Sequence, residues 1–491
     1  PEKLRHFEAL TGTGLYALGP EIHESNLNGK LRTYERLTDW VDTTTVAFMG
    51  QTFACARCLD HKTDPISQRD YFAMQAIFAG SSEIEVPIQH GMGIADWKQH
   101  YPKMIAVEEA RMAYDHFVQQ TSGRARTPEE EQQLQKLKTA IADRVLALPK
   151  TDAQKQVYAG IYERPTITVL GHHRAELIPA VHRLDRGDLN RAREKMHPAL
   201  PEYLGGSATS RKDLALWLTQ PDHPLTARVM INRIWQWHFG RGIVATASDF
   251  GKMGIEPTHP ELLDWLATEF IAKDWSIKAM HRLIMTSETY KQSSSFFSEE
   301  HGRVDPDNTL LWRMNRRRLE GEAVWDAIHS VSGTINLKMG GRPVMPPLLA
   351  EELTNKSNWI ESQIPSDHTR RGLYIIVRRN FKFPLFDLFD APVNAVSCSG
   401  RNVSTVAPQA LWLLNNQTGF NQAEHFAARL VREVGSKPED QIQRAFETAL
   451  GRQANEEEIA EGLALLQQLP DDGLTKFCLL LFNLNEFLYV D

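Results

Sequence analysis

A chain of 491 residues is longer than one hydrophobic core usually supports, so the sequence predicts two to four domains. Apolar residues make up 42% of the chain and charged residues 24%, which is typical of folded protein and excludes a disordered or fibrous chain. The formal net charge is −7 with both signs mixed throughout, so we expect no nucleic-acid partner. No apolar run approaches the roughly 18 residues that cross a bilayer, and we expect no membrane span.

The four cysteines are too few for a disulfide-stapled scaffold, and their number leaves the cellular compartment open. The first residues, Pro1–Arg5, show no basic segment followed by an apolar one. We therefore expect that a signal peptide is either absent or lies upstream of Pro1.

Helical patterns dominate much of the chain. Apolar residues at helical spacing predict an amphipathic helix over residues 70–78 that ends at Gly80. The segment Thr127–Glu130 is a capping box with proline at the first helical position, and it predicts a long surface helix or helical hairpin arm. Thr258 with Glu261 predicts a second capping box ahead of another amphipathic helix.

Two short segments predict strands. Residues 166–170 are mostly β-branched and apolar, and they predict a small β-rich insert between residues 165 and 204. Residues 372–377 form a continuous apolar run, which is typical of a buried strand. Apart from these segments the helical signals prevail, so we expect a mainly α, multidomain fold with a few strands in its C-terminal domain.

Changes in the helical and strand patterns along the sequence predict three regions. Residues 1–110 contain the Cys-x-x-Cys segment. Residues 111–205 contain the helical arm and the β-rich insert. Residues 206–491 return to dense helical signals, and we expect them to form one large helical domain.

The densest chemistry follows Cys55, where two thiols, an imidazole and two carboxylates fall within ten positions. Two thiols three residues apart are the pattern that attaches haem c through thioethers, and the next residue is normally the histidine that ligates iron. That residue is Leu59 here, and leucine cannot ligate iron. One interpretation is therefore a haem c site made by Cys55 and Cys58, with His61 as the iron ligand if the backbone turns differently.

Two other interpretations of this segment stay open. A structural zinc site normally takes four ligands from two paired clusters, and the sequence has one pair. A disulfide, or two buried thiols, would make the segment purely structural, while dithiol redox chemistry lacks the strand–motif–helix context of a thioredoxin-like site. A divalent metal would be held by residues drawn from Cys58, Asp60, His61 and Asp64.

Carboxylates are the first candidates for hydrolysis, because two positioned acids suffice for glycoside chemistry. The sequence has no Gly-x-Ser-x-Gly elbow, no His-Glu-x-x-His and no phosphate-cradling loop, so these common hydrolase and nucleotide sites are excluded. No spacing shows that the acids meet. The candidate catalytic residues are Asp249, Glu261, Asp387 and Asp390.

Two arginine clusters could hold an anionic substrate, because guanidinium groups match carboxylate and sulfate oxygens. The candidate substrate-binding residues are Arg316, Arg371 and Arg378. The alternative is a salt-bridged surface. Because the second cluster flanks the predicted buried strand, we expect one of its arginines to reach inside and pair with Asp387 or Asp390.

The segment from Cys55 to Tyr71 closely resembles the cysteine motif of a planctomycete cytochrome-c-associated family of unknown function, whose pattern usually runs Cys-x-x-Cys-His-Asp-His-Lys. Later segments resemble its partner, called the planctomycete-specific domain one. The resemblance covers nearly the whole chain. The segments that carry the second resemblance are residues 228–242, 249–251, 259–265, 282–287, 371–374, 390–392, 408–411, 414–416 and 485–487.

This resemblance implies a location and a partner more than a reaction. Members of the family are typically exported and often carry an upstream cytochrome-c domain, so we expect a periplasmic or extracellular protein with a cytochrome partner. Leu59 departs from the family pattern, which puts haem attachment in doubt. The chain also opens partway through the first family domain, and a segment upstream could supply an absent ligand.

Two functions from different classes follow. The first is an exported haem- or metal-linked protein, a redox or hydrolytic enzyme in extracytoplasmic polysaccharide degradation. The second is a non-catalytic scaffold or binding partner of a cytochrome or a cell-envelope assembly. A cleft with converging carboxylates and tryptophans would favour the enzyme, and a broad apolar patch without a cleft would favour the scaffold.

Overall fold

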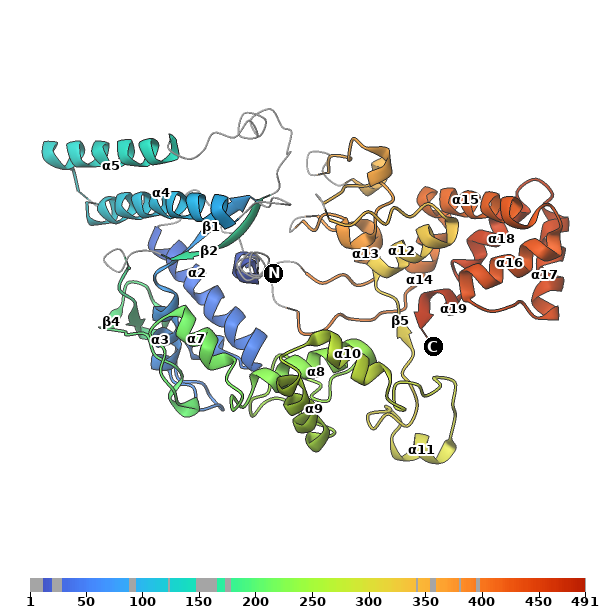
Figure 1. The fold of residues 1–491 in the computed structure, drawn as a ribbon, viewed down its shortest axis with the longest axis horizontal. Helices are drawn as coiled ribbons and strands as arrows, with labels where there is room; N and C mark the ends of the chain where they lie inside the picture. Colours follow the sequence, from blue (N-terminus) through green and yellow to red (C-terminus); the bar gives the residue numbers. More distant parts are fainter. Residues whose placement is uncertain are drawn as a thin grey trace. The chain divides into compact units, whose positions relative to one another are not determined.

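The computed structural model divides the chain into two compact units (Figure 1). Unit 1 comprises residues 1–234 and 242–279, and unit 2 comprises residues 235–241 and 280–491. The three regions predicted from the sequence are a different division, and they stay a prediction. The structure describes residues 12–19, 29–87, 94–121, 124–146, 166–172, 178–340, 343–353, 359–378, 381–393 and 398–490.

The fold is mainly α-helical, as predicted, and the described residues form only small two-stranded sheets. None of the helices within the described ranges is both long and apolar enough to cross a membrane. The first elements of the chain are η1 (Thr13–Ala17), α2 (Gly29–Thr44), η2 (Thr45–Met49), η3 (Phe53–Arg57), α3 (Gln68–Phe78), β1 (Ser81–Pro87), α4 (Ile94–Gln120), α5 (Pro128–Leu146), β2 (Thr166–His172), β3 (His182–Leu184), η5 (Asp185–Gly187), β4 (Ala192–Lys195), η6 (Glu202–Leu204), α7 (Arg211–Leu218), α8 (Thr226–Phe239), α9 (Pro260–Ala272) and α10 (Ile277–Met285).

Helix α3 is the centre of the core of unit 1, and it confirms the helix predicted at residues 70–78. A capping box begins it: Ser67 Oγ accepts from Asp70 N at 3.1 Å, and Asp70 Oδ2 accepts from Ser67 N at 2.8 Å. Every residue of α3 except Arg69 is buried. Its largest contact is with α2, so these two helices hold the segment between them, which contains the cysteines.

The predicted helical arm is a pair of helices, α4 and α5, which lie side by side (Figure 1). The capping box at the start of α5 is present, because Thr127 Oγ1 accepts from Glu130 N at 3.3 Å and Glu130 Oε2 accepts from Thr127 N at 2.9 Å. Arg124 also pairs with Glu130 at 2.5 Å. The local signal was therefore sufficient to place the start of this helix.

The strand predicted at residues 166–170 is confirmed as β2, but its partner is distant in sequence. It pairs antiparallel with β1, from Ser81 opposite His172 to Pro87 opposite Thr166. The strands β3 and β4 form a separate pair. The predicted β-rich insert is thus not a sheet of its own, because half of its first sheet comes from before the arm.

Unit 2 is a helical assembly around a second core, in which α15 packs on both α12 and α18. The terminal strand β6 pairs with β5. The elements of this part of the chain are α11 (Glu299–Val304), β5 (Arg317–Arg318), α12 (Gly321–Ser332), η7 (Ala350–Glu352), η9 (Pro365–Asp367), η10 (Gly372–Tyr374), α13 (Pro384–Leu388), α14 (Ala407–Asn415), α15 (Gln417–Val434), α16 (Pro438–Leu450), α17 (Glu456–Gln468), α18 (Gly473–Leu481), α19 (Asn485–Leu488) and β6 (Tyr489–Val490).

The buried strand predicted at residues 372–377 is wrong. The segment begins with the single turn η10, and Ile375 then forms only an isolated bridge with Val344. Leu373 and Val377 are 56% and 67% exposed, so the apolar run is not buried along its length.

Contacts with α12 explain this turn. Gly372 N donates to Asp326 Oδ1 at 2.6 Å, which turns the backbone toward α12. A Cβ atom on Gly372 would lie 2.8 Å from Glu322 O, so glycine allows the close approach. A tertiary hydrogen bond thus overrides the local preference of the apolar run for a strand.

The second predicted capping box is also wrong. Helix α9 begins at Pro260, and His259 precedes it without a side-chain cap. Thr258 Oγ1 instead pairs with His259 Nδ1 at 2.9 Å, while Thr258 N donates to Ile243 O at 2.9 Å. Thr258 therefore closes the loop before the helix, and Pro260 needs no cap for a backbone N–H that it lacks.

Candidate functional site: an exposed cysteine turn

The two cysteines of the Cys-x-x-Cys segment lie on one tight turn of unit 1. Cys55 lies within the 3₁₀-helix η3 and Cys58 follows its last residue. Both are exposed and neither is in a disulfide. Side chains three residues apart on a 3₁₀-helix lie on the same face, and three rises of about 2 Å separate their Cα atoms by roughly 6 Å, within the range of a disulfide. The turn therefore presents a dithiol that could close without large backbone movement.

Gln68, the first residue of α3, stabilises this turn through hydrogen bonds to its carbonyl groups. Its Nε2 donates to the carbonyls of Arg57 at 3.1 Å, Cys58 at 3.0 Å and Leu184 at 2.8 Å. Its backbone N donates to Asp60 Oδ1 at 2.8 Å. Gln68 is buried, so these hydrogen bonds fix the carbonyls at the end of η3 against the start of α3.

Both ring nitrogens of His61 are used inside the segment. Nδ1 accepts from Asp64 N at 2.9 Å, and Nε2 lies 3.2 Å from Thr52 Oγ1. A nitrogen that accepts from a backbone N–H carries no proton, so the ring is the neutral tautomer with its proton on Nε2. The side chain is 6% exposed. His61 thus stabilises the segment through contacts with Thr52 and Asp64.

Asp64 ties the cysteine segment to the loop before α9. Its Oδ1 accepts from Lys252 N at 2.7 Å. Gly251 lies so close that a Cβ atom there would meet Asp64 Oδ2 at 2.5 Å. Asp64 Oδ2 also lies 3.5 Å from His61 Nδ1. Asp64 therefore serves as an anchor for a backbone loop.

These contacts decide how well haem or a metal fits the residues present. Leu59, at the position of the usual iron ligand, is 66% exposed, and the alternative ligand His61 has neither nitrogen free. Asp60 and Asp64 accept backbone hydrogen bonds, and the described residues contain no group of three metal-ligating side chains. The arrangement does not fit an axial ligand from this segment. Haem c and a divalent metal stay predictions.

Gly187, Tyr34 and Arg57 surround Cys58, an arrangement that no sequence pattern indicated. Gly187, with φ +74°, approaches so closely that a Cβ atom on it would lie 3.1 Å from Cys58 Sγ and 3.7 Å from Tyr34 Oη. The Arg57 guanidinium lies 5.8 Å from the Tyr34 ring centroid and 3.8 Å from Glu35. Cys58 is thus the thiol that faces both a phenol and a cation.

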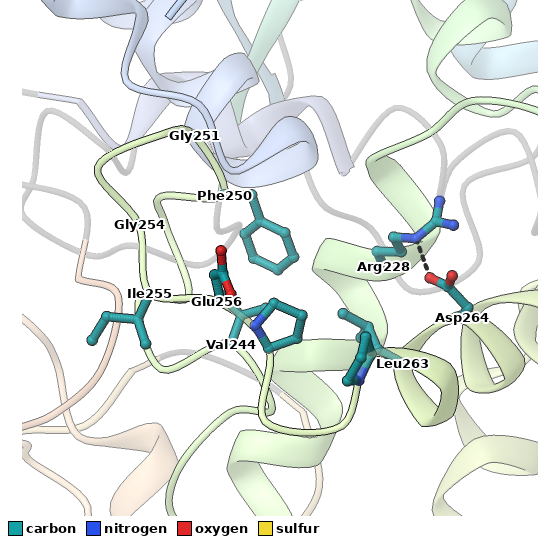
Figure 2. Close-up of a pocket in the computed structure, with 11 residues that line it drawn as sticks. Arg228, Val244, Phe250, Gly251, Gly254, Ile255, Glu256, Leu263 and Asp264 are labelled. Atoms are coloured by element: carbon teal, nitrogen blue, oxygen red, sulfur yellow. Dashed lines mark hydrogen bonds and ion pairs between the residues drawn. The ribbon is translucent and has the colours of Figure 1, made fainter. Parts of the chain in front are cut away.

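Beyond the turn, the loop from Val244 to His259 encloses a hollow of about 220 Å³ (Figure 2). The Asn232 side chain fixes this loop, donating to Val244 O at 2.9 Å and accepting from Val244 N at 2.8 Å. The hollow is lined by apolar side chains such as Phe250, with Arg228 and Asp264 paired at 2.6 Å on one side. The ion pair engages Arg228 and Asp264 with each other, while Glu256 also lines the hollow.

The two catalytic candidates in unit 1 are not brought together in this hollow. Asp249 Oδ1 accepts from Gly251 N at 2.9 Å and so stabilises the loop. Glu261 is exposed on the first turn of α9. Neither residue lines the hollow.

The two candidates in unit 2 each have a cation of their own. Asp387 pairs with Lys382 at 2.8 Å on the surface. Asp390 pairs with the buried Arg318 at 2.7 Å and accepts from Ser404 N at 2.8 Å. Burial alone would raise the pKa of Asp390, but the hydrogen bonds from Ser404 and Arg318 outweigh it, and the pKa lies below its ordinary value. Asp390 is therefore a structural carboxylate.

The predicted partner of the inward-facing arginine is wrong. Arg370 reaches inside, as expected, and is 2% exposed. Its Nη2 donates to the carbonyls of Lys338 at 3.0 Å and Gly340 at 2.5 Å, and its guanidinium stacks on the Tyr374 ring. Carbonyl dipoles and an aromatic face thus contact this guanidinium, while Asp387 and Asp390 pair with Lys382 and Arg318.

The three candidate substrate-binding arginines do not share one arrangement. Arg371 pairs with Asp326 at 2.9 Å. Arg316 is exposed, and Arg378 is half-buried beyond η10. Their role in binding an anion stays a prediction.

Two family models match the chain. The first, PSCyt2, a protein of unknown function (DUF1549), matches residues 2–83. The second, PSD1, a protein of unknown function (DUF1553), matches residues 210–466, which is more than half of the 491 residues. The chain belongs to the PSD1 family. These matches confirm the resemblance seen in the sequence, and no curated protein and no solved structure matches the chain.

The cysteine turn lies in the PSCyt2 match, and the loop it anchors lies in the PSD1 match. The PSD1 region also contains a histidine pair that the sequence did not predict, with His238 Nε2 2.8 Å from His281 Nδ1. Burial, followed by His281 and Arg317, lowers the pKa of His238. The pair is built by residues 43 positions apart, so no local spacing could have indicated it.

Proposed function

We propose that this protein is an exported redox component that works with a cytochrome, and that Cys55 and Cys58 are its redox group. The observation that carries the proposal is the pair of exposed, unlinked thiols on one turn. Thiol reactivity depends on access, and only exposed thiols can meet a protein partner. The family's association with cytochromes and with export supports the partner and the location.

The reaction is the oxidation of a dithiol to a disulfide. Cys55 and Cys58 lose two protons and two electrons, and a bond forms between their sulfur atoms. Two molecules of a separate ferric c-type cytochrome each accept one electron on their haem, which becomes ferrous. The roughly 6 Å expected between the two Cα atoms suits both the reduced and the oxidised state, so the exchange demands little rearrangement.

The test uses the reduced, purified protein and a ferric mono-haem cytochrome c. We expect the ferrous α-band to appear, and the mass of the peptide containing Cys55 and Cys58 to fall by two hydrogens. Cys55→Ser should abolish both changes. Cys398→Ser is the matched control, because Cys398 is also an exposed, unlinked thiol. Equal haem reduction by Cys55→Ser would refute the proposal.

Two other outcomes would point elsewhere. A thioether-type pyridine haemochrome spectrum from the chain itself, purified from its native host, would replace the dithiol with covalent haem. Binding of the cytochrome without electron transfer would favour the non-catalytic binding partner. Polysaccharide degradation has weaker support, because Asp249, Asp387 and Asp390 are engaged individually in a loop and in ion pairs. The fourth candidate, Glu261, is exposed on α9 and does not line the hollow.

A further inference from the structure

A row of polar side chains lies inside unit 1 behind the cysteine turn. Tyr34, Thr38 and Asp42 follow one another at four-residue steps, so they share one face of α2. Tyr71 and Gln75, four residues apart on α3, face this row, and Gln75 Nε2 donates to Thr38 Oγ1 at 3.1 Å. The interface between α2 and α3 is thus polar along one line, although both helices belong to an apolar core.

Three atoms of this row are buried without satisfied hydrogen bonds: Tyr34 Oη, Tyr71 Oη and Asp42 Oδ1. Native proteins rarely leave such groups unpaired, and three together require an explanation. Interactions nevertheless link them, because the Thr38 side chain lowers the pKa of both phenols and the Tyr71 side chain lowers the pKa of Asp42. Rotation of the hydroxyl groups, or one water molecule, would complete a continuous chain of hydrogen bonds.

One end of the row reaches the cysteine turn. The position of a Cβ atom on Gly187 would be 3.1 Å from Cys58 Sγ and 3.7 Å from Tyr34 Oη, so the thiol and the phenol border the same small space. The Tyr34 phenol also interacts electrostatically with Cys58 and Arg57. The row therefore begins at the thiol and ends at the carboxyl group of Asp42.

The charges around Asp42 decide which member of the row exchanges a proton near neutral pH. Burial raises the pKa of Asp42 to about 7, against the opposing effect of Arg57 on η3; Asp39 and Glu35 on α2 also raise it, and Tyr71 on α3 lowers it. Burial likewise raises the pKa of Tyr34 to about 12 and that of Tyr71 further. The phenols thus stay protonated while Asp42 changes charge.

We propose that Asp42 is the buried proton acceptor for Cys58, reached through the hydroxyl groups of Tyr34, Thr38 and Tyr71. This inference rests on the proposed dithiol function and adds the route of one proton. When the disulfide forms, the S–H bond of Cys58 breaks and the sulfur keeps the electron pair. Each hydroxyl passes one proton along the row, and the Asp42 carboxylate ends protonated. The proton of Cys55 leaves to solvent; Cys58 is also exposed, but it is the thiol that borders Tyr34.

Asp42 and the three hydroxyl-bearing residues are positioning and proton-transfer groups, not groups that touch a partner. Their effect should therefore appear in a pH profile. The probe is dithiodipyridine, a small disulfide that oxidises the dithiol without a cytochrome: it accepts the two electrons, and each of its two halves leaves as a thiol that takes its proton from solvent. Proton transfer to Asp42 can thus be disproved while cytochrome reduction succeeds. Equally, cytochrome reduction can fail while the pH profile supports proton transfer to Asp42.

We expect the oxidation rate of the wild-type dithiol to rise with an inflection near the pKa of Asp42. Asp42→Asn, which is nearly isosteric, should remove that inflection and slow oxidation at neutral pH, on the order of 100-fold. Tyr34→Phe should slow oxidation similarly while leaving the carboxyl group in place. Asp143→Asn is the matched control, because it removes the same charge from an exposed position of α5.

Infrared difference spectra give a second readout that does not depend on rate. Oxidation of the wild-type protein should produce the C=O band of a protonated carboxyl group, and this band should be missing in Asp42→Asn. A pH profile unchanged in Asp42→Asn, or a carboxyl band that persists in it, would overturn the inference. If Asp42→Asn fails to fold, the Tyr34→Phe profile and the wild-type infrared band still decide it.

Discussion

His61 and Gln68 show how residues of the cysteine turn acquire their roles. The imidazole is the more reactive group by residue type, yet its two nitrogens are engaged by Thr52 and by Asp64 N. Gln68 carries no chemical signal in the sequence, yet its side chain holds three carbonyls. Contacts therefore decide which of the two residues is available for chemistry. Here they leave the thiols as the reactive groups.

The half-buried Asp42, whose Oδ1 atom is fully buried, should make stability depend on pH. Because burial raises its pKa from 3.8 to about 7, the folded state favours the protonated form. Its contribution is therefore fully present below the unfolded pKa and is lost as pH rises through about 7. We expect the free energy of unfolding of unit 1 to fall between pH 4 and pH 8 by up to about 4 kcal/mol from this group.

Denaturant unfolding across that pH range measures this effect. Asp42→Asn stays neutral, so its unfolding free energy should vary less over the same range, with Asp143→Asn again behaving as wild type. A pH dependence as steep in Asp42→Asn as in wild type would show that another group causes it.

At the scale of elements, helix starts were predictable where the signal is local. The boxes at Ser67 and Thr127 each join residues three apart, so the sequence contains both partners. The box expected at Thr258 failed because its hydroxyl group found His259 and its backbone found Ile243. Residues 372–377 failed as a strand because Asp326 of α12 bonds the backbone of Gly372. Both errors involve a backbone N–H that bonds a partner distant in sequence, Ile243 for Thr258 and Asp326 for Gly372.

The cap of α3 should matter for both stability and the cysteine turn. Ser67→Ala removes the hydroxyl group that accepts from Asp70 N, and we expect unfolding to become easier by about 1 kcal/mol. Gln68, the first residue of α3, donates hydrogen bonds to the cysteine turn, so the alkylation rate of Cys58 should also change. Thr127→Ala is the control: it removes a similar cap on α5 and should leave the alkylation rate unaltered. If Cys58 is alkylated at the same rate in both variants, the cap of α3 has no influence on the cysteine turn.

At the scale of the whole molecule, the family matches and the cores divide the chain differently. The PSD1 match begins at residue 210, within unit 1, and ends in unit 2. Two separate clusters of buried apolar residues are present among the described residues, one in each unit. A boundary of sequence similarity is thus not a boundary of a hydrophobic core.

Two cores predict two separable unfolding transitions. Phe72 lies in the core of unit 1 and Phe426 in that of unit 2, and both are fully buried. Each change to alanine should cost about 3–5 kcal/mol. In calorimetry we expect Phe72→Ala and Phe426→Ala to lower different transitions. One transition lowered equally by both variants would mean that the units unfold together.

The sequence by itself determined the helical class, the helices α3 and α5, the strand β2 and the resemblance to the two family models. It did so because periodicity, capping boxes and contiguous motifs depend on neighbours along the chain. Only the tertiary structure decided that His61 is engaged, that Asp390 pairs with Arg318, and that Asp42 is buried behind Cys58. Desolvation and pairing depend on residues far apart in sequence, and folding alone brings these together.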